Sequence, residues 1–385
     1  MSLHFFFFAG EPSADLYGSA LIQFLKGKVD HLKLSGVGGP LMRAEGVKGQ
    51  LQMEQLQVMG FSDVLKALPR LYRYFRQTLK LVLTLQPDVV ILIDYPGFNL
   101  RLAKALRKNG YQGKIVQYIS PSVWAHGKGR IQTLAQTVDL LLTIYPFEKA
   151  LFSQYPLKVE YVGHPLMQTI ADWQRTIKEK LDHKEICQQP YMALFPGSRL
   201  SEIKRHFPFL LKIAQAFKKK APAWQFVCCY VDSSHLSLMQ KLAKKHSFPM
   251  QDLLFVSSHQ RYQVMQKASL ALAKSGSVTL ELALLKVPTV VIYQLSALNF
   301  LIAKYFLRLR LSHYCIVNII AKKEIFPEFI GISLSFKHVL EKLEQLYKNQ
   351  ELTKKMQQQC QELKALLTFA NSHKLAAKAI MRLFV

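Results

Sequence analysis

Two short turns in the second half of the chain carry residues that suit a phosphate group. Pro196-Gly197-Ser198-Arg199 follows the apolar run 192–195, and Ser275-Gly276-Ser277 follows the run 269–273. Glycine lets a backbone approach a ligand closely, serine offers a hydroxyl, and arginine presents a forked cation to phosphate oxygens. A helix after each turn adds free N–H groups and a positive dipole end. One such turn is also an ordinary strand–helix connection, but two favour a nucleotide diphosphate held between them.

Asp94 is the candidate general base of the first half. It directly follows the apolar run 88–93 and precedes Tyr95-Pro96-Gly97. An ionised carboxylate at the end of a strand can take a proton from a substrate hydroxyl. The alternative is a helix cap, but Asn99 suits that role and leaves Asp94 free to face a ligand.

Further polar residues lie in loops that follow the expected strands. Glu11, Ser13 and Asp15 occupy the first turn and are candidate substrate-binding residues, although Ser13 or Asp15 can instead cap a helix. His126 and His164 are loop histidines, for which a structural hydrogen-bonding role is the commoner one. No set of His, Cys, Asp or Glu has metal-ligand spacing, so we expect no metal. Neither G-x-G-x-x-G nor G-x-x-x-x-G-K-[ST] occurs, which disfavours a dinucleotide cofactor and a P-loop.

The elements that must position these residues alternate regularly between strand and helix. The apolar runs predict strands over 3–8, 32–37, 88–93, 115–119, 139–144, 159–162, 192–195, 225–230, 253–256, 269–273 and 289–293. Helical segments between strands indicate parallel sheets, which bind ligands beyond the carboxyl ends of their strands. The sequence therefore predicts an α/β protein with two Rossmann-like, doubly wound domains, 1–175 and 191–335, facing a cleft. A charged linker spans 176–190, and the helical tail 336–385 is expected to pack back on the first domain.

Composition narrows the class of partner. The chain has 385 residues, half of them hydrophobic, and a net charge of +26, which attracts nucleic acid, anionic membranes or phosphorylated substrates. The odd number of cysteines, five, with no C-x-x-C pair indicates reduced thiols in a cytoplasmic protein. The first apolar run ends at Gly10, too early for a signal peptide, and no apolar run is long enough to span a bilayer.

Taken together, these residues resemble those of the lipid-A-disaccharide synthase family, inverting glycosyltransferases of the GT-B fold. Each matching motif is weak alone, but the series keeps its order along nearly the whole chain. The motifs are AGEPSAD (9–15), VMGF (58–61), IDYPGFN (93–99), SPSVWA (120–125), PFE (146–148), GHP (163–165), PGSR (196–199), SGSVTLE (275–281) and VN (317–318).

The resemblance implies a reaction and assigns residues to it. The family joins UDP-2,3-diacylglucosamine to 2,3-diacylglucosamine 1-phosphate, giving a β-1,6-linked disaccharide phosphate and UDP, as a step in lipid A biosynthesis of Gram-negative bacteria. It implies that Asp94 is the base, that Arg199 and Asn318 are its essential polar partners, and that Glu281 binds ribose hydroxyls. No cofactor is implied. Two departures are Ala14, where the family usually has glycine, and His126, where it usually has tryptophan.

Two other functions compete with this one. A different GT-B enzyme, such as a UDP-N-acetylglucosamine epimerase or a transferase with a soluble acceptor, would share the diphosphate turns. A nucleic-acid-binding protein would explain the charge, but no aromatic-basic strand or helix-turn-helix signature is present, so we expect no nucleic acid partner. A homodimer is compatible with the sequence.

A basic amphipathic helix over 63–85 predicts peripheral contact with a membrane. Every charged residue from 66 to 80 is positive, and aromatic residues of the kind found at bilayer interfaces lie among them. The alternative is a core helix with a solvated basic face. We expect the cytoplasmic face of the inner membrane to be contacted by Met59, Phe61, Leu68, Arg70, Leu71, Tyr72, Arg73, Phe75 and Arg76. A second basic-aromatic stretch occupies 300–308.

Overall fold

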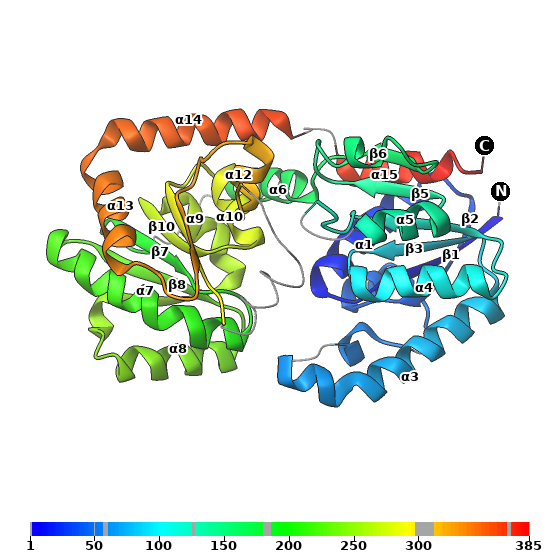
Figure 1. Cartoon of the computed structure of the whole chain (residues 1–385), viewed down its shortest axis with the longest axis horizontal. Coiled ribbons are helices and arrows are strands. Elements are labelled where there is room, and N and C mark those ends of the chain that lie inside the picture. The colour runs from blue at the N-terminus through cyan, green and yellow to red at the C-terminus, as the bar shows by residue number, and fades with distance from the viewer. Residues whose placement is uncertain are drawn as a thin grey trace. The chain divides into compact units, whose positions relative to one another are not determined.

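The computed structural model describes residues 2–49, 51–56, 61–124, 128–179, 186–296, 312–367 and 371–384. The chain divides into two compact units. Unit 1 contains Met1–Gln168 together with Leu367–Val385, and unit 2 contains Thr169–Leu366. Each unit is built on one six-stranded parallel sheet with helices around it (Figure 1).

The sheet of unit 1 is covered on both faces. Its strands are β1 (Ser2–Ala9), β2 (His31–Val37), β3 (Val89–Ile93), β4 (Lys114–Tyr118), β5 (Leu140–Thr143) and β6 (Lys158–Tyr161). Four consecutive phenylalanines in β1 are fully buried, because alternate side chains enter opposite faces. Phe5 and Phe7 join one hydrophobic core and Phe6 and Phe8 the other.

Helices supply the other half of each core in unit 1. Residues of α1 and α15 pack with Phe5 and Phe7, whereas residues of α3 and α4 pack with Phe6 and Phe8. The helices with residues in this unit are α1 (Pro12–Lys26), α2 (Pro40–Ala44), α3 (Phe61–Leu85), α4 (Pro96–Lys108), α5 (Lys128–Thr137), α6 (Pro165–Glu179) and α15 (Ser372–Met381), with short 3-10 turns at Met53–Leu56 and Lys149–Phe152. The boundary between the units falls inside α6.

Unit 2 repeats the arrangement. Its strands are β7 (Tyr191–Phe195), β8 (Gln225–Tyr230), β9 (Leu253–Ser257), β10 (Leu270–Lys274), β11 (Thr289–Gln294) and β12 (Glu328–Gly331). The helices are α7 (Leu200–Lys220), α8 (Ser233–Lys245), α9 (Arg261–Lys267), α10 (Ser277–Leu284), α12 (Ile316–Ala321), α13 (Phe336–Lys348) and α14 (Gln350–Leu366), with 3-10 turns at Met250–Asp252 and Ser258–Gln260. In Figure 1, α7 and α8 lie side by side.

Strand order places one switch point in each sheet. In unit 1 the order is β2-β1-β3-β4-β5-β6, so the chain leaves β1 on one side for β2 and later adds β3 on the other. In unit 2 the order is β12-β11-β10-β7-β8-β9, and the reversal lies between β7 and β10. In doubly wound sheets the loops at such a reversal separate and leave room for a ligand at the carboxyl ends of the strands. The α/β architecture predicted from the sequence is confirmed.

Several local predictions differ from the structure. α3 continues through Pro69 and α7 through Pro208, although proline removes a backbone hydrogen-bond donor from a helix. β12 at the sheet edge was not predicted. The expected helical tail is divided: α13 and α14 belong to unit 2, and α15 alone returns to unit 1. The reason is apolar packing, because Leu363 and Met356 are buried in unit 2 whereas Ala376 and Ile380 complete the core of unit 1.

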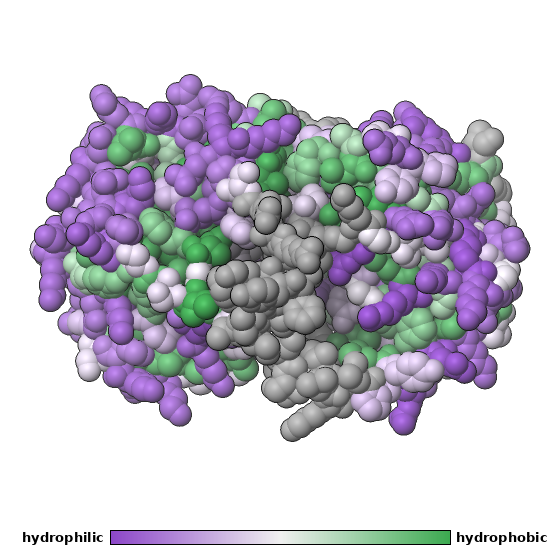
Figure 2. Space-filling view, viewed as in Figure 1, coloured by the Kyte–Doolittle hydropathy of each residue, from purple (hydrophilic) through white to green (hydrophobic). Residues whose placement is uncertain are grey.

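The face of the molecule drawn in Figure 2 is mostly polar. Figure 2 shows hydrophilic residues spread over this face, with smaller hydrophobic areas among them. Within the part of the chain that the structure describes, no helix is long and apolar enough to cross a membrane.

Candidate active site

Glu11 and Asp94 meet at the switch point of unit 1. Parallel pairing sets Ala9 beside Ile93, so the residues that follow β1 and β3 leave the sheet next to each other. Glu11 is the N-cap residue of α1, and its side chain makes no hydrogen bond or ion pair with any residue in the described ranges. Asp94 is half-buried. Two carboxylates are therefore brought together at the ligand-binding edge.

The backbone at Asp94 is held in an uncommon conformation. Asp94 and Tyr95 have positive φ values of 47° and 49°, and Ile119 at the end of the neighbouring strand has 71°. Such values are uncommon for residues other than glycine and are an outlier for a β-branched residue. Asp94 N donates to the Tyr118 carbonyl at 2.9 Å, and the side-chain amides of Asn99 and Gln117 donate to the Asp94 carbonyl. These contacts fix the direction of the Asp94 carboxylate. Backbone held in an uncommon conformation is often found at functional sites.

The same surroundings make Asp94 a better base than an exposed aspartate. Burial is the main cause, and repulsion from Glu11 the second, that raises the pKa of Asp94 to about 6. A backbone hydrogen bond at Tyr95 acts in the opposite direction and lowers this pKa. A carboxylate of that pKa is largely ionised at neutral pH and binds a proton more strongly than usual. Both properties suit a general base.

The other two residues expected in this turn have different surroundings. Ser13 lies exposed in the first turn of α1, and α1 starts with Pro12, so neither Ser13 nor Asp15 caps it. Asp15 is buried instead and accepts hydrogen bonds from the N–H groups of Gly39, Leu41 and Met42 at 2.8–3.0 Å. Its carboxylate thus satisfies the free N-terminal donors of α2, which gives Asp15 a structural role, and its contact with substrate stays a prediction.

The first turn of unit 2 is closely packed around glycine. Gly197 has φ +119°, which other residues rarely adopt, and a Cβ there would collide with the Glu202 side chain unless that side chain moved. Glu202 Oε2 accepts a hydrogen bond from Ser198 N at 3.1 Å. Arg199 is exposed at the N-cap of α7, and its guanidinium makes no hydrogen bond or ion pair with any described residue. The guanidinium is therefore available to an anionic ligand.

The second turn lies beside the first because β7 and β10 are paired, Phe195 with Ala273. Ser275, Gly276 and Ser277 lead into α10, and the Thr279 hydroxyl donates to the Gly276 carbonyl at 2.7 Å. Lys274, at the end of β10, forms an ion pair with Glu202 of α7 at 3.0 Å. The sequence predicted both turns but gave no sign that Lys274 and Glu202 join them.

Glu281 lies deep in α10 and is 8% exposed. Its Oε1 accepts a hydrogen bond from the Tyr262 hydroxyl at 3.0 Å, and two nitrogens of Arg261 approach it at 3.4 Å. The Arg261 guanidinium also stacks over the Tyr262 ring at 4.2 Å. Burial raises the pKa of Glu281 even though Arg261 counteracts it. The printed sequence shows no spacing that would have revealed Arg261 and Tyr262 as partners, because they come from another helix, α9.

Asn318 is bonded to the backbone of a neighbouring segment. It is fully buried in α12. Its Oδ1 accepts hydrogen bonds from the N–H groups of Ile325 and Phe326 at 2.8 and 2.9 Å, and its Nδ2 donates to the Phe326 carbonyl at 2.7 Å. These contacts hold the segment that leads into β12, so the side chain of Asn318 positions this backbone, and its role as a catalytic partner stays a prediction.

Of the two loop histidines, the structure describes His164 alone. His126 lies outside the described residues. His164 is buried, its pKa is lowered by burial to about 3, and its Nδ1 accepts a hydrogen bond from Leu166 N, which indicates a structural role.

Near His164, Glu148 is fully buried, its Oε2 accepts hydrogen bonds from Ile144 N and Tyr145 N, and burial raises its pKa to about 8. No group of three or more His, Cys, Asp or Glu that could hold a metal is found in the described ranges.

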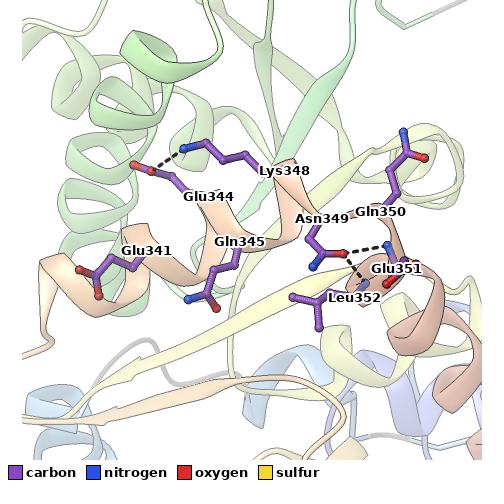
Figure 3. A pocket seen from close by; sticks show the side chains of 8 residues that line it. All are labelled: Glu341, Glu344, Gln345, Lys348, Asn349, Gln350, Glu351 and Leu352. Atoms are coloured by element: carbon purple, nitrogen blue, oxygen red, sulfur yellow. Dashed lines mark hydrogen bonds and ion pairs between the residues drawn. The ribbon is translucent and has the colours of Figure 1, made fainter.

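A hollow lies at the junction of α13 and α14 (Figure 3). Its polar groups are used locally: Glu344 pairs with Lys348, and Asn349 Oδ1 accepts hydrogen bonds from the N–H groups of Glu351 and Leu352. These contacts cap a helix, and the hollow offers no arrangement for chemistry.

Comparison with solved structures supports the fold. The chain superposes on UDP-GlcNAc 2-epimerase from Methanocaldococcus jannaschii, solved in complex with UDP-GlcNAc and UDP, with a TM-score of 0.63 and 11% identity over 99% of this chain and 100% of the other. A glycosyltransferase from Rickettsia africae gives a TM-score of 0.54 at 10% identity, covering 99% and 97%. The fold is therefore GT-B-like.

Comparison of sequences identifies the family. A lipid-A-disaccharide synthase from Coxiella burnetii is 33% identical over 97% of each chain. One from Chlamydia pneumoniae is 40% identical over 86% of this chain, and the chain spans about half the length of this and the other chlamydial relatives. The family model described as lipid-A-disaccharide synthetase matches residues 5–381. The two switch-point sites thus lie in a chain that belongs to the lipid-A-disaccharide synthase family.

Proposed function

We propose that this protein transfers a diacylglucosaminyl group from UDP-2,3-diacylglucosamine to 2,3-diacylglucosamine 1-phosphate, with inversion, to give the β-1,6-linked disaccharide phosphate and UDP. The observation that carries the proposal is the placement of two complementary sites at the two switch points. One offers a carboxylate of raised pKa, Asp94, and the other offers cations and backbone donors near Arg199. Membership of the family supplies the substrates.

Each unit has its own task in this proposal. Unit 1 binds the acceptor, and Asp94 removes the proton from its 6-hydroxyl as that oxygen attacks the anomeric carbon. Unit 2 binds the donor: Glu281 takes the ribose hydroxyls, while Gly197, Ser198, Ser275, Gly276 and Ser277 surround the diphosphate. Arg199 stabilises the negative charge that develops on the departing UDP. Asn318 and Asp15 act by holding the neighbouring backbone.

The direct test supplies both lipid substrates to the purified protein and measures UDP and the disaccharide phosphate. The matched control is Asp94→Asn, which keeps the shape of the side chain but cannot accept the proton. Formation of both products by the parent, with turnover lowered about 100-fold or more in Asp94→Asn, supports the proposal. Release of UDP without disaccharide, or equal turnover in both proteins, contradicts it.

We also propose that exposed residues of α3 hold the protein at an anionic membrane surface. Arg70, Arg73 and Arg76 are exposed in succession along the helix, with Tyr72, which is 64% exposed, among them. Two other residues of the expected contact set, Leu71 and Phe75, are partly buried and pack against the core of unit 1, so the exposed residues carry this proposal. Met59 and the side chains of Phe61 and Leu68 lie outside the described residues, as does the stretch 300–308. Each basic residue near an anionic leaflet contributes about 1 kcal/mol.

Vesicle binding tests this second proposal. Replacing all three arginines by Glu should abolish binding to vesicles with anionic lipid at low salt. The matched control changes the total charge equally on another exposed helix, α8, by replacing Lys241, Lys244 and Lys245 with Glu, and should keep most of the binding. If both triple variants bind equally, net charge alone explains the attraction and α3 has no special role.

A further inference from the structure

An internal carboxylate already occupies the donors of the diphosphate turns. Glu202 Oε2 accepts the Ser198 N–H at 3.1 Å, and Glu202 Oε1 faces Lys274 Nζ at 3.0 Å. One donor belongs to the turn after β7 and the other to the end of β10. The carboxylate therefore bridges the two turns in the way that an oxygen-rich anion would.

Lys274 lies in the middle of this arrangement and is largely buried. Its side chain is 15% exposed and that of Glu202 is 17% exposed. The ammonium lies above the ring of Tyr293, 5.1 Å from its centroid, and a Cβ on Gly276 would be 3.6 Å from Nζ. The ammonium thus has one anionic partner and one aromatic face and lies close to the glycine turn, where it can contact a second anion.

The charges around Glu202 favour its ionised form. Burial acts to raise the pKa of Glu202, but the charge and hydrogen bond of Lys274, together with the Ser198 N–H and the Arg199 charge, hold it below its ordinary value. An ionised carboxylate therefore lies between the two turns at which we place the diphosphate.

We propose that Glu202 is a built-in competitor of the nucleotide diphosphate, and that Lys274 is a second cation of the leaving-group site, exchanging Glu202 for a phosphate oxygen when the donor binds. The inference rests on the proposed function, because it concerns the same donor site. It adds a positioning function that none of the motifs indicated: Glu202 keeps Lys274 and the Ser198 N–H aligned while the site is empty and is displaced from them by the ligand.

Calorimetric titration with UDP and with uridine tests the exchange. Glu202→Gln removes the internal charge and should strengthen UDP binding about 3- to 10-fold. Adding Lys274→Met to Glu202→Gln should then weaken UDP binding about tenfold or more, while uridine binding stays constant, because only the diphosphate contacts the ammonium. Using the Glu202→Gln background leaves no buried carboxylate without a partner, so the fold is preserved.

Lys218→Met is the matched control. Lys218 lies on the same helix, α7, and pairs with Asp252 at 2.7 Å with similar burial, but next to Trp224 at the amino ends of the strands. It should leave UDP binding unchanged. The proposed exchange is wrong if Glu202→Gln weakens UDP binding, or if adding Lys274→Met has no effect, while the parent still binds UDP. Either result would leave the proposed donor site of unit 2 unchallenged. If the folded parent binds no UDP, the donor site and the exchange both fail.

Discussion

Asp94→Asn should make the protein more stable while it removes activity. The raised pKa of Asp94 means that the folded state holds its proton more tightly than the unfolded chain, where the value is 3.8. Between pH 3.8 and about 6 the folded state therefore binds more protons, and stability falls as the pH rises through this window. Above about pH 6 Asp94 is ionised in the folded parent, whose stability is lowered by the full cost of burying this charge. Asparagine is uncharged and has no such cost.

The size of the effect follows from the shift. A change of roughly 2 pKa units corresponds to about 3 kcal/mol, and solvent screening of a half-buried group reduces the expected gain to about 1–2 kcal/mol. Asn adds no backbone cost, because it tolerates the left-handed φ of 47° better than most residues. Asp94→Ala removes the same carboxylate but also the short polar side chain that lets Asp and Asn adopt left-handed φ values, so it should be about 1 kcal/mol less stable than Asp94→Asn.

Tryptophan positions provide the assay. Trp124 belongs to unit 1, whereas Trp173 and Trp224 belong to unit 2, so a background with the latter two changed to Phe reports the unfolding of unit 1 alone. Urea titrations at pH 8 and pH 4 compare the parent with both variants. We expect Asp94→Asn to be more stable at pH 8 and equal to the parent at pH 4.

Two results would refute this reasoning. One is a lower stability of Asp94→Asn at pH 8, which would mean that the carboxylate is favourably paired. The other is a gain that does not depend on pH, which would assign the effect to something other than the charge. In the parent, kcat/KM should fall as the pH drops below about 6, because the protonated carboxyl cannot act as a base.

Four further substitutions separate ligand contacts from structural ones. Arg199→Ala should weaken UDP binding about tenfold or more and slow turnover, because a charge-assisted contact is lost; Glu281→Ala should weaken binding with less effect on the chemical step. Calorimetry with UDP decides this, and unchanged affinity in both variants would remove unit 2 as the donor unit. Asp15→Asn should lower the unfolding free energy of unit 1 by about 1–3 kcal/mol, since three N–H groups share its carboxylate. Asn318→Ala should destabilise unit 2 by about 3 kcal/mol through its three lost backbone contacts, and normal thermal unfolding of either variant would show that these contacts are unimportant.

Long apolar strands and the turns after them were predictable from the sequence. β1 and β3 are buried on both faces, so their residues form uninterrupted apolar runs, and Asp94 could be placed at a strand end. The predicted PGSR turn lies where the sequence placed it, after β7. β12 was missed because Glu328–Gly331 is short, only half-buried and at the edge of the sheet, so no apolar run marks it.

Side-chain partners far apart in the chain were not predictable. Asp15 and Asn99 are of residue types that often cap helices. Because Pro12 and Pro96 begin those helices, both side chains make other contacts. Asp15 then reaches the start of α2, and Asn99 reaches the Asp94 carbonyl. Lys274 and Glu202 are 72 residues apart, and only the pairing of β7 with β10 brings them together.

The return of α15 to unit 1 imposes an order on synthesis. Ala376 and Ile380 fill the same core as Leu21 and Ile22, and Tyr118 bonds to His373 at 3.1 Å. A ribosome must therefore translate all of Thr169–Leu366 before the first unit receives its last piece. At about 5–20 residues per second, the nascent first unit waits about 10–40 s with this part of its core uncovered. Unit 2, whose chain is continuous, can finish folding first, so the growing polypeptide needs protection longest at the end that was made earliest.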